Sequence, residues 1–242
     1  MSGQRAQRAE DRSPGSGSEH APVALPALRR RVLVAGLVLL VLGVLVTALV
    51  AVTSTRSAVQ AVDDGWYRLM VEHRWAPVVT LSDVLSTAFS AAVGWPVRIL
   101  VTVVIAVRRH WLALAAWAST VLLSELLIGP TKMLVDRPRP SGSLIATSGL
   151  SYPSGHAIAS AVTAIGVVMA LTSGRRRLYW MVVAAALAAL VALSRTYLSA
   201  HWLSDVVGGS LLGAGFALAV PEAFEVARDR IWPARIRMGR QG

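Results

Sequence analysis

Long apolar runs constrain this chain more strongly than any other feature of its sequence. Between residues 32 and 52 only Thr47 interrupts a run of 21 residues, about the length that a helix needs to cross a hydrocarbon core of roughly 30 Å at 1.5 Å per residue. This run is too long for a signal peptide, and no small-residue cleavage site follows it. Further apolar segments lie at residues 77–107, 111–130, 156–172, 178–193 and 202–220. The sequence therefore predicts an all-α integral membrane protein, a bundle of six transmembrane helices.

The composition agrees with a membrane protein rather than a soluble domain. Hydrophobic residues make up 55% of the 242 residues and charged residues only 15%, too few to cover a soluble surface. The formal charge of +11 would suggest nucleic acid in a soluble chain, but here the basic residues cluster between apolar segments, as topology signals do. We therefore expect membrane lipids and no nucleic acid as partners. Because the chain has no cysteine, disulfides and thiolate metal sites are excluded.

Clusters of arginine divide the predicted loops into two sides. Basic residues lie at 29–31, in the turns at 108–110 and 175–177, and again after residue 221. Six spans place all four clusters on one side, which the positive-inside rule assigns to the cytoplasm. Residues 54–75 mix charges with aromatic residues, which suits a helix lying at the outer interface.

This topology predicts the organisation of the whole chain. We expect a disordered cytoplasmic tail over residues 1–31, a transmembrane domain over residues 32–220 and a basic cytoplasmic tail over residues 221–242. The protein would cross the cell membrane several times, with the 131–155 loop and the 194–201 turn on the extracytoplasmic side.

Polar residues that a membrane span does not need gather at the ends of four apolar segments, all on the predicted outer side. They are Lys132, Arg139, Ser154, Gly155, His156, Arg195, His201 and Asp205. Ionisable residues at or within membrane spans are rare and usually functional. Their convergence on one level predicts a functional site there.

Five of these residues suit the binding of a phosphate. Lys132, Arg139 and Arg195 supply three positive charges, and the arginine fork matches phosphate oxygens two at a time. Ser154 stands where a loop ends and a helix begins, so the free amides near Gly155 form an anion site that the helix dipole reinforces.

Two histidines and a carboxylate can divide the chemistry. His201 and Asp205 are four residues apart, so the carboxylate can reach one ring nitrogen and direct the other toward the substrate. His156 lies on a different helix and can give a proton to the leaving oxygen. The pattern predicts a phosphohistidine intermediate, with His201 as the nucleophile, His156 as the acid and Asp205 as the residue that orients His201.

Three short motifs carry a resemblance to a known family. K-x6-R-P matches KMLVDRPRP at residues 132–140, P-S-G-H matches residues 153–156, and S-R-x5-H-x3-D matches SRTYLSAHWLSD at residues 194–205. Together they resemble the three-part signature of the type 2 phosphatidic acid phosphatase (PAP2) family. The resemblance implies a six-helix core, a membrane lipid phosphatase without metal or other cofactor, and the roles given above. Soluble haloperoxidases share similar motifs, but the apolar spans argue against that branch.

The resemblance also implies which residues hold the phosphate. These are Lys132, Arg139, Ser154, Gly155, His156 and Arg195. The lipid itself stays open, and the candidates are phosphatidic acid, phosphatidylglycerol phosphate, undecaprenyl diphosphate and related prenyl phosphates. The oligomeric state is not predicted.

Several alternatives remain at this point. A lipid phosphotransferase would form the same intermediate and pass the phosphoryl group to another alcohol. A protein that only binds or transports anionic lipid is a further alternative, although binding needs no nucleophile such as His201. A zinc site made by His156, His201 and Asp205 is disfavoured, because three nearby cations would repel the metal.

Two ionisable residues fall inside predicted spans. Arg98 and Glu125 are expected to be neutralised by each other or by the backbone. Glu125 lies seven residues before Lys132, roughly 10 Å deeper at the helical rise, and could instead support Lys132 or Arg139 from below. Three glycines of the last span are expected to let it pack closely against a neighbour: Gly208, Gly209 and Gly213.

Overall fold

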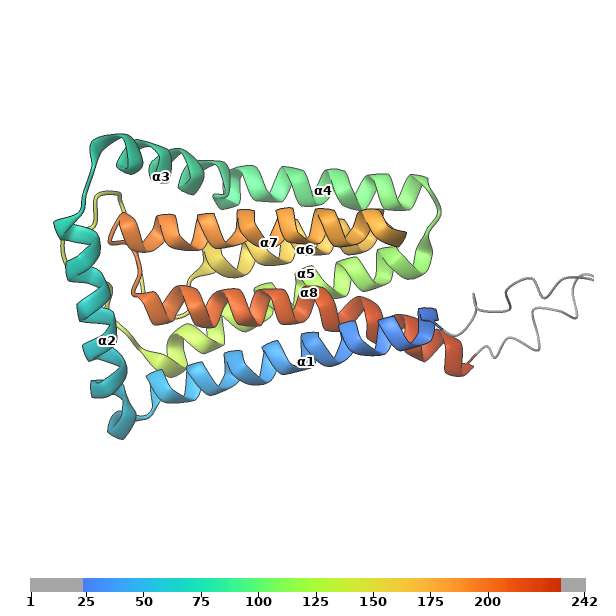
Figure 1. The fold of residues 1–242 in the computed structure, drawn as a ribbon, viewed down its shortest axis with the longest axis horizontal. Helices are drawn as coiled ribbons and strands as arrows, with labels where there is room; N and C mark the ends of the chain where they lie inside the picture. Colours follow the sequence, from blue (N-terminus) through green and yellow to red (C-terminus); the bar gives the residue numbers. More distant parts are fainter. Residues whose placement is uncertain (1–23, 232–242) are drawn as a thin grey trace, which may run out of the picture.

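The computed structural model describes residues 24–231, and within this range the chain forms eight α-helices and no strands. In chain order they are α1 (Ala24–Ala51), α2 (Thr53–Glu72), α3 (Ala76–Ala88), α4 (Ala91–Val107), α5 (Trp111–Val135), α6 (Gly155–Leu171), α7 (Gly174–Tyr197) and α8 (Leu203–Ile231). Seven helices run along one bundle, and α2 lies across one end of it (Figure 1). The predicted all-α class is confirmed.

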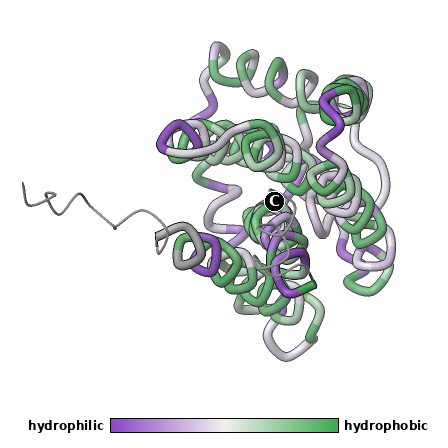
Figure 2. The backbone as a smooth tube through the Cα atoms, turned by 90° about the vertical axis from the view of Figure 1, so that its right-hand side faces the viewer, coloured by the Kyte–Doolittle hydropathy of each residue, from purple (hydrophilic) through white to green (hydrophobic). Residues whose placement is uncertain are grey.

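The helices have the length and the surface of membrane spans. α1, α5, α7 and α8 are long and apolar enough to cross a membrane, and α3 with α4 add a fifth span if this bent pair is counted as one. α6 is apolar but has only 17 residues, so the predicted count of six is approximate. Leu37, Val41 and Leu45 of α1 are exposed on the outside of the bundle, and Figure 2 shows hydrophobic residues along most of the helices. An exposed surface this apolar is typical of contact with lipid.

The second predicted span is broken rather than continuous. The sequence predicts one span over residues 77–107, but α3 ends at Ala88, α4 begins at Ala91, and the two axes differ by 47°. Ser90 has an extended backbone at the start of α4, which interrupts the helix. The bend allows α3 to pack against α7 while α4 packs against α5 and α6. The segment is therefore a bent helix pair rather than one continuous helix, a difference that hydropathy does not show.

Both ends of the helical region extend beyond the predicted boundaries. Residues 24–31 belong to α1 and residues 221–231 belong to α8, although the sequence predicts tails there. Arg29 in the first extension forms a 3.0 Å ion pair with Glu225 in the second, so the two extensions stabilise each other. Hydropathy marks the apolar part of a helix and not its polar ends. The rest of the predicted tails lies outside the described residues.

Glycines allow α8 to pack closely against α6, as predicted. A Cβ atom added to Gly213 would lie 2.7 Å from the carbonyl oxygen of Ile158, and one added to Gly209 would lie 2.9 Å from that of Ser154. Gly208 approaches a tyrosine ring just before α6 in the same way. Only glycine permits this helix separation, because a larger residue would push the backbones apart. The first turns of α6 and α8 are thereby held side by side.

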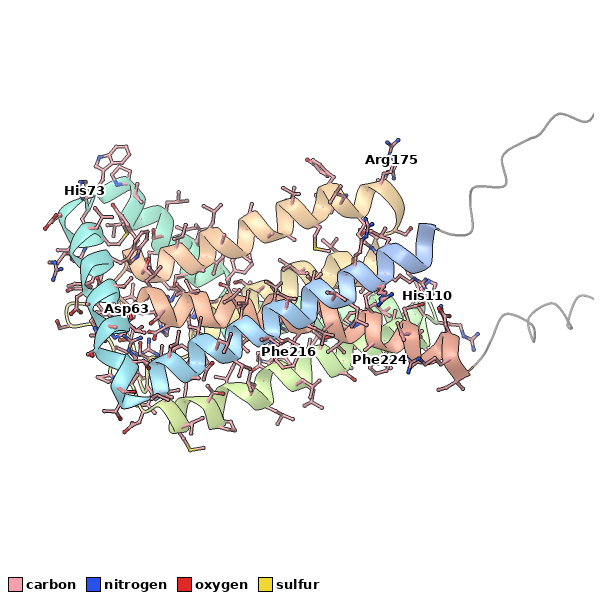
Figure 3. The ribbon with its side chains drawn as sticks, turned by 60° about the horizontal axis from the view of Figure 1, so that its bottom comes forward. Asp63, His73, His110, Arg175, Phe216 and Phe224 are labelled. Carbon is pink, nitrogen blue, oxygen red and sulfur yellow. The ribbon has the colours of Figure 1, made fainter. Side chains whose placement is uncertain are left out.

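The bundle has two ends of different character. Asp63 and His73 lie at the end that α2 covers, and His110 and Arg175 lie at the opposite end (Figure 3). The turns that carry the arginine clusters lie at this opposite end, together with the start of α1 and the end of α8 (Figure 1). The motif residues lie at the end that α2 covers.

Candidate active site

Asp205 lies in the first turn of α8, and its carboxylate is held through both oxygens. Oδ2 accepts hydrogen bonds from the backbone N–H of Trp202 at 2.8 Å and from the hydroxyl of Ser151, and Oδ1 accepts from Nη1 of Arg137 at 3.0 Å. The bond to Trp202 is the backward reach of a capping box, so the helix start itself positions the carboxylate. Nδ1 of His201 lies 3.4 Å from Oδ2. The carboxylate therefore faces the inner ring nitrogen of His201 from a fixed position.

His201 presents its outer ring nitrogen to Arg139. Nη1 of Arg139 lies 3.0 Å from Nε2 of His201 and also donates to the carbonyl of Ala200 at 2.8 Å. Because a guanidinium cannot accept, Nε2 is the acceptor, and a neutral ring then carries its proton on Nδ1, toward Asp205. Burial lowers the pKa of His201 to about 4; Asp205 opposes this shift and Arg139 adds to it. At neutral pH the ring is neutral, with a lone pair on Nε2.

The three predicted cations are held by oxygens at this end of the bundle. Lys132 donates to the backbone carbonyl of residue 150, and Arg139 donates to the carbonyls of residues 148–150. Arg195, at the end of α7, donates to the hydroxyl of Ser86 on α3. The charges of Arg139 and Arg195 act on both histidines of the site. A phosphate placed here would meet several positive charges at once.

The start of α6 has the geometry of an anion site. The hydroxyl of Ser154 accepts from the backbone N–H of Ala157 at 3.4 Å and so caps the helix. The N–H of Ser154 donates to the backbone carbonyl of Asp205 at 3.1 Å, which joins the start of α6 to the start of α8. The amides of Gly155 and His156 lie in the first turn and have no carbonyl partner within the helix. They are therefore available to an anion at the helix N-terminus.

The ring of His156 is fixed by α3. Its Nε2 lies 3.2 Å from the backbone carbonyl of Ser86, and since a carbonyl only accepts, this nitrogen carries a proton. The hydroxyl of the same Ser86 accepts from Arg195. His156 also interacts electrostatically with His201 and Arg139. Two imidazoles from different parts of the chain thus belong to one basic cluster.

All eight residues selected from the sequence lie at this end of the bundle. The structure joins His201 directly to Arg139 and Asp205, and it joins His156 to Arg195 through Ser86. The remaining three are Lys132, Ser154 and Gly155. The side chains of Lys132 and Ser154 bond to the backbone near the cluster rather than to the ring of His201. Among residues 24–231, no three His, Asp or Glu side chains are grouped as ligands of a metal ion.

A buried arginine within the first motif was not among the predicted site residues. Arg137 precedes Arg139 by two residues, and its guanidinium bonds to Asp205 on α8 and, at 2.6 Å, to Asp63 on α2. Nη1 also donates to the hydroxyl of Ser204 at 2.6 Å. Asp63 accepts from the backbone N–H of Ser204 at 2.8 Å, so a residue of α2 caps the first turn of α8. These contacts hold the carboxylate of Asp205 from behind.

The signals for the missed residues differ in strength. Arg137 could have been found as a further cation between two motif residues. Asp63 and Ser86 gave no comparable signal. Asp63 lies 74 and 141 residues from its partners Arg137 and Ser204, and Ser86 lies 70 and 109 residues from His156 and Arg195.

The ionisable pair predicted inside the spans neutralises itself. Nη1 of Arg98 lies 2.6 Å from Oε1 of Glu125. The alternative, in which Glu125 supports Lys132 or Arg139 from below, is wrong. Lys132 is held by the carbonyl of Leu150 instead.

Comparisons with known proteins show what the chain is similar to. The chain is 34% identical over 116 residues to phosphatidylglycerophosphatase B of Bacillus subtilis, covering 44% of this chain and 55% of that protein. It is 38% identical over 107 residues to decaprenylphosphoryl-5-phosphoribose phosphatase of Mycolicibacterium smegmatis, covering 42% and 53%. The chain therefore spans about half the length of these curated relatives.

The fold has a solved counterpart. The structure of a transmembrane PAP2-type phosphatidylglycerolphosphate phosphatase from Bacillus subtilis aligns with a TM-score of 0.64, covering 82% of this chain and 98% of that one. The sequence identity is 21%, so this likeness shows the fold. The family model of the PAP2 superfamily matches residues 109–229, half of the chain and the part that contains all eight selected residues. The chain belongs to the PAP2 superfamily.

Proposed function

We propose that this chain is an integral membrane lipid phosphatase that acts through a phosphohistidine on His201. The observation that carries the proposal is the orientation of the His201 ring, with Nδ1 toward Asp205 at 3.4 Å and Nε2 toward Arg139 at 3.0 Å. A protein that only binds anionic lipid needs cations, but it needs no buried imidazole with an oriented lone pair. The names of the relatives, both lipid phosphatases, support the same conclusion.

The reaction proceeds in two displacements. In the first, Nε2 of His201 attacks phosphorus, the bond from phosphorus to the leaving oxygen breaks, and the imidazolium form of His156 gives that oxygen the proton of Nδ1, since its Nε2–H is held by the carbonyl of Ser86. The carboxylate of Asp205 stabilises the positive charge that the phosphorylated ring gains. In the second, His156 takes a proton from water, the water oxygen attacks phosphorus, and the phosphorus–nitrogen bond breaks to release inorganic phosphate. Arg139 and Arg195 stabilise the charge on the phosphoryl oxygens in both transition states.

An apolar cavity next to His156 supports a lipid as the substrate. It has a volume of about 520 Å³ and lies along α6, between α4 and α7. Trp95 and Trp180 line it and are exposed at the outside of the bundle, where a membrane protein meets lipid. The apolar tail would enter sideways from the membrane, while the phosphate reaches the basic cluster.

The distribution of charge favours an extracytoplasmic site. The arginine clusters at 108–110 and 175–177 lie at the end of the bundle opposite to Asp63 (Figure 3). The positive-inside rule assigns that end to the cytoplasm. The histidines would then act at the outer leaflet of the cell membrane.

A panel of lipid phosphates tests this function. Phosphatidic acid, phosphatidylglycerol phosphate, undecaprenyl diphosphate and a prenyl monophosphate are assayed for released phosphate in detergent, with His201→Ala as the blank. We expect turnover of at least one lipid by the wild-type protein and none by the variant, which keeps the wild-type melting temperature to within a few degrees. Turnover by His201→Ala, or none by the wild type on any lipid, would count against the proposal.

Labelled water separates hydrolysis from transfer to another alcohol. A hydrolase places one solvent oxygen in every released phosphate. A phosphotransferase instead forms a new phosphate ester when an alcohol acceptor is added, without solvent oxygen in it.

A further inference from the structure

The apolar cavity next to His156 has a cluster of polar side chains deeper in the bundle. Arg98 of α4, Glu125 of α5 and Thr163 of α6 all line it. Arg98 donates to Glu125 at 2.6 Å, to the hydroxyl of Thr163 at 3.0 Å and to the carbonyl of Ala159 at 3.4 Å. Its guanidinium also lies 5.3 Å from the ring of Trp95. Three helices thus contribute polar groups to one cluster in a mostly apolar wall.

An ion pair at this depth is expensive in a membrane protein. The desolvation of both charges offsets much of their attraction, and apolar residues of similar volume would hold three helices together at least as well. A purely structural pair would also have no reason to line a cavity. The placement therefore points to a ligand that needs a polar partner here.

The depth of the pair identifies the part of a lipid that it would meet. Ala159 and Thr163 lie three and seven residues beyond His156 on α6, roughly 4.5 and 10.5 Å along the helix at 1.5 Å per residue. In a glycerophospholipid, five bonds separate phosphorus from the nearer acyl carbonyl, an extended reach of roughly 6 Å. A phosphate beside His156 therefore brings an ester carbonyl to the level of Arg98. A prenyl phosphate has only hydrocarbon at this level.

The chemistry of the pair suits a neutral acceptor. A guanidinium has five N–H groups, and in the described part of the chain Arg98 uses three of them on protein partners. The charge of Arg98 is balanced by Glu125, so a second phosphate would meet a carboxylate as well as a cation. A carbonyl oxygen can accept from Arg98 without bringing a charge into the cavity.

We propose that Arg98, Glu125 and Thr163 form a subsite that binds an acyl ester carbonyl, so that diacylglycerol phosphates are better substrates than prenyl phosphates. This inference rests on the proposed lipid phosphatase function and names its substrate class. Glu125 and Thr163 are positioning residues, because they orient the guanidinium that touches the ester.

Three lipids and one double variant test the subsite. The lipids are dioleoyl phosphatidate, its diether analogue, which lacks both carbonyls, and farnesyl phosphate; the measurement is kcat/KM for phosphate release. Arg98→Met with Glu125→Leu replaces the ion pair by apolar side chains and leaves no buried charge alone. We expect the wild type to prefer the diester over the diether by about tenfold, the effect of one hydrogen bond to a charged donor. The double variant loses this preference while it still releases phosphate from the diether and from farnesyl phosphate.

Two further variants keep the test decisive. Arg177→Met with Glu222→Leu makes the same changes in an ion pair at the opposite end of the bundle and should keep the diester preference. Thr163→Val, which keeps both charges paired, should weaken the preference and so reports on the subsite if the double variant does not fold.

Failure of the subsite and failure of the function look different. Equal rates for diester and diether in the wild type, or an unchanged preference in the variants at Arg98 and Thr163, overturn the subsite while phosphatase activity remains. Release of phosphate from none of the three lipids by the wild type overturns the phosphatase function, and the subsite with it.

Discussion

Replacing Arg137 by methionine tests whether the buried charges behind Asp205 act as one unit. Arg137 is 2% exposed, and its partners Asp63 and Asp205 are 1% and 0% exposed. The substitution leaves two buried carboxylates without the cation between them. Breaking a buried ion pair from one side destabilises a protein by about 3–5 kcal/mol, because a charge is left uncompensated. Each kcal/mol lowers the melting temperature of a chain of this size by roughly 2–4 °C, so we expect a loss of about 6–20 °C.

Thermal unfolding in detergent measures this loss, with Arg175→Met as the matched control. Arg175 is exposed at the opposite end of the bundle (Figure 3), and its replacement should change the melting temperature little. Adding Asp63→Asn to Arg137→Met removes one of the two carboxylates, so the double variant should be at least as stable as Arg137→Met alone. The reasoning is refuted if Arg137→Met melts like Arg175→Met. It is also refuted if the effects of the two substitutions simply add.

Three further predictions follow from the site and its packing. Gly209→Ala pushes the Ser154 carbonyl away from α8 and should lower kcat by about tenfold or more, because the first turn of α6 is then misplaced. Gly129→Ala is the control, since it has open space around its Cβ, and it should leave kcat unchanged. Equal kcat values for the two variants would contradict this prediction. Because burial lowers the pKa of His201 to about 4, the folded protein binds fewer protons than the unfolded chain between pH 6.5 and 4. The stability that His201 contributes is therefore complete above pH 6.5, and the free energy of unfolding falls by about 2 kcal/mol between pH 7.5 and 5. His201→Gln should lack this part of the loss in unfolding free energy. Identical pH profiles of unfolding for the wild type and His201→Gln would refute the prediction. Chelators should leave turnover unchanged while vanadate inhibits it, since vanadate adopts the five-coordinate geometry of the transition state; inactivation by a chelator would contradict the mechanism.

Local patterns predicted the fold class, and they selected residues that lie together at one end of the bundle. The apolar runs indicated helices, because a helix forms its backbone hydrogen bonds internally and is therefore stable in lipid. Three motifs indicated the residues around His201 because each motif is a short continuous stretch of sequence at the end of a helix. The close packing of helices at Gly209 and Gly213 was also predicted correctly, because these glycines lie close together in the sequence of one span.

Long-range contacts could not be predicted from the sequence. The break between α3 and α4 positions Ser86 against both His156 and Arg195, and hydropathy carries no information on such a bend. The contact of Asp63 with Arg137 and the start of α8 depends on how α2 crosses the end of the bundle. Neither depends on a periodicity or a spacing that a single sequence displays.

Chemical trapping of the phosphorylated residue tests the central claim most directly. The best lipid of the panel, labelled in its phosphate, is mixed with the wild-type protein and quenched in alkali within milliseconds, and the labelled peptide is identified by mass spectrometry. We predict acid-labile label on His201, and none in His201→Gln. In His156→Gln the label should appear and decay more slowly, because this variant lacks the acid of the first displacement and the base of the second. Label on another residue, or no label in either the wild type or His156→Gln while phosphate is released, would contradict the account.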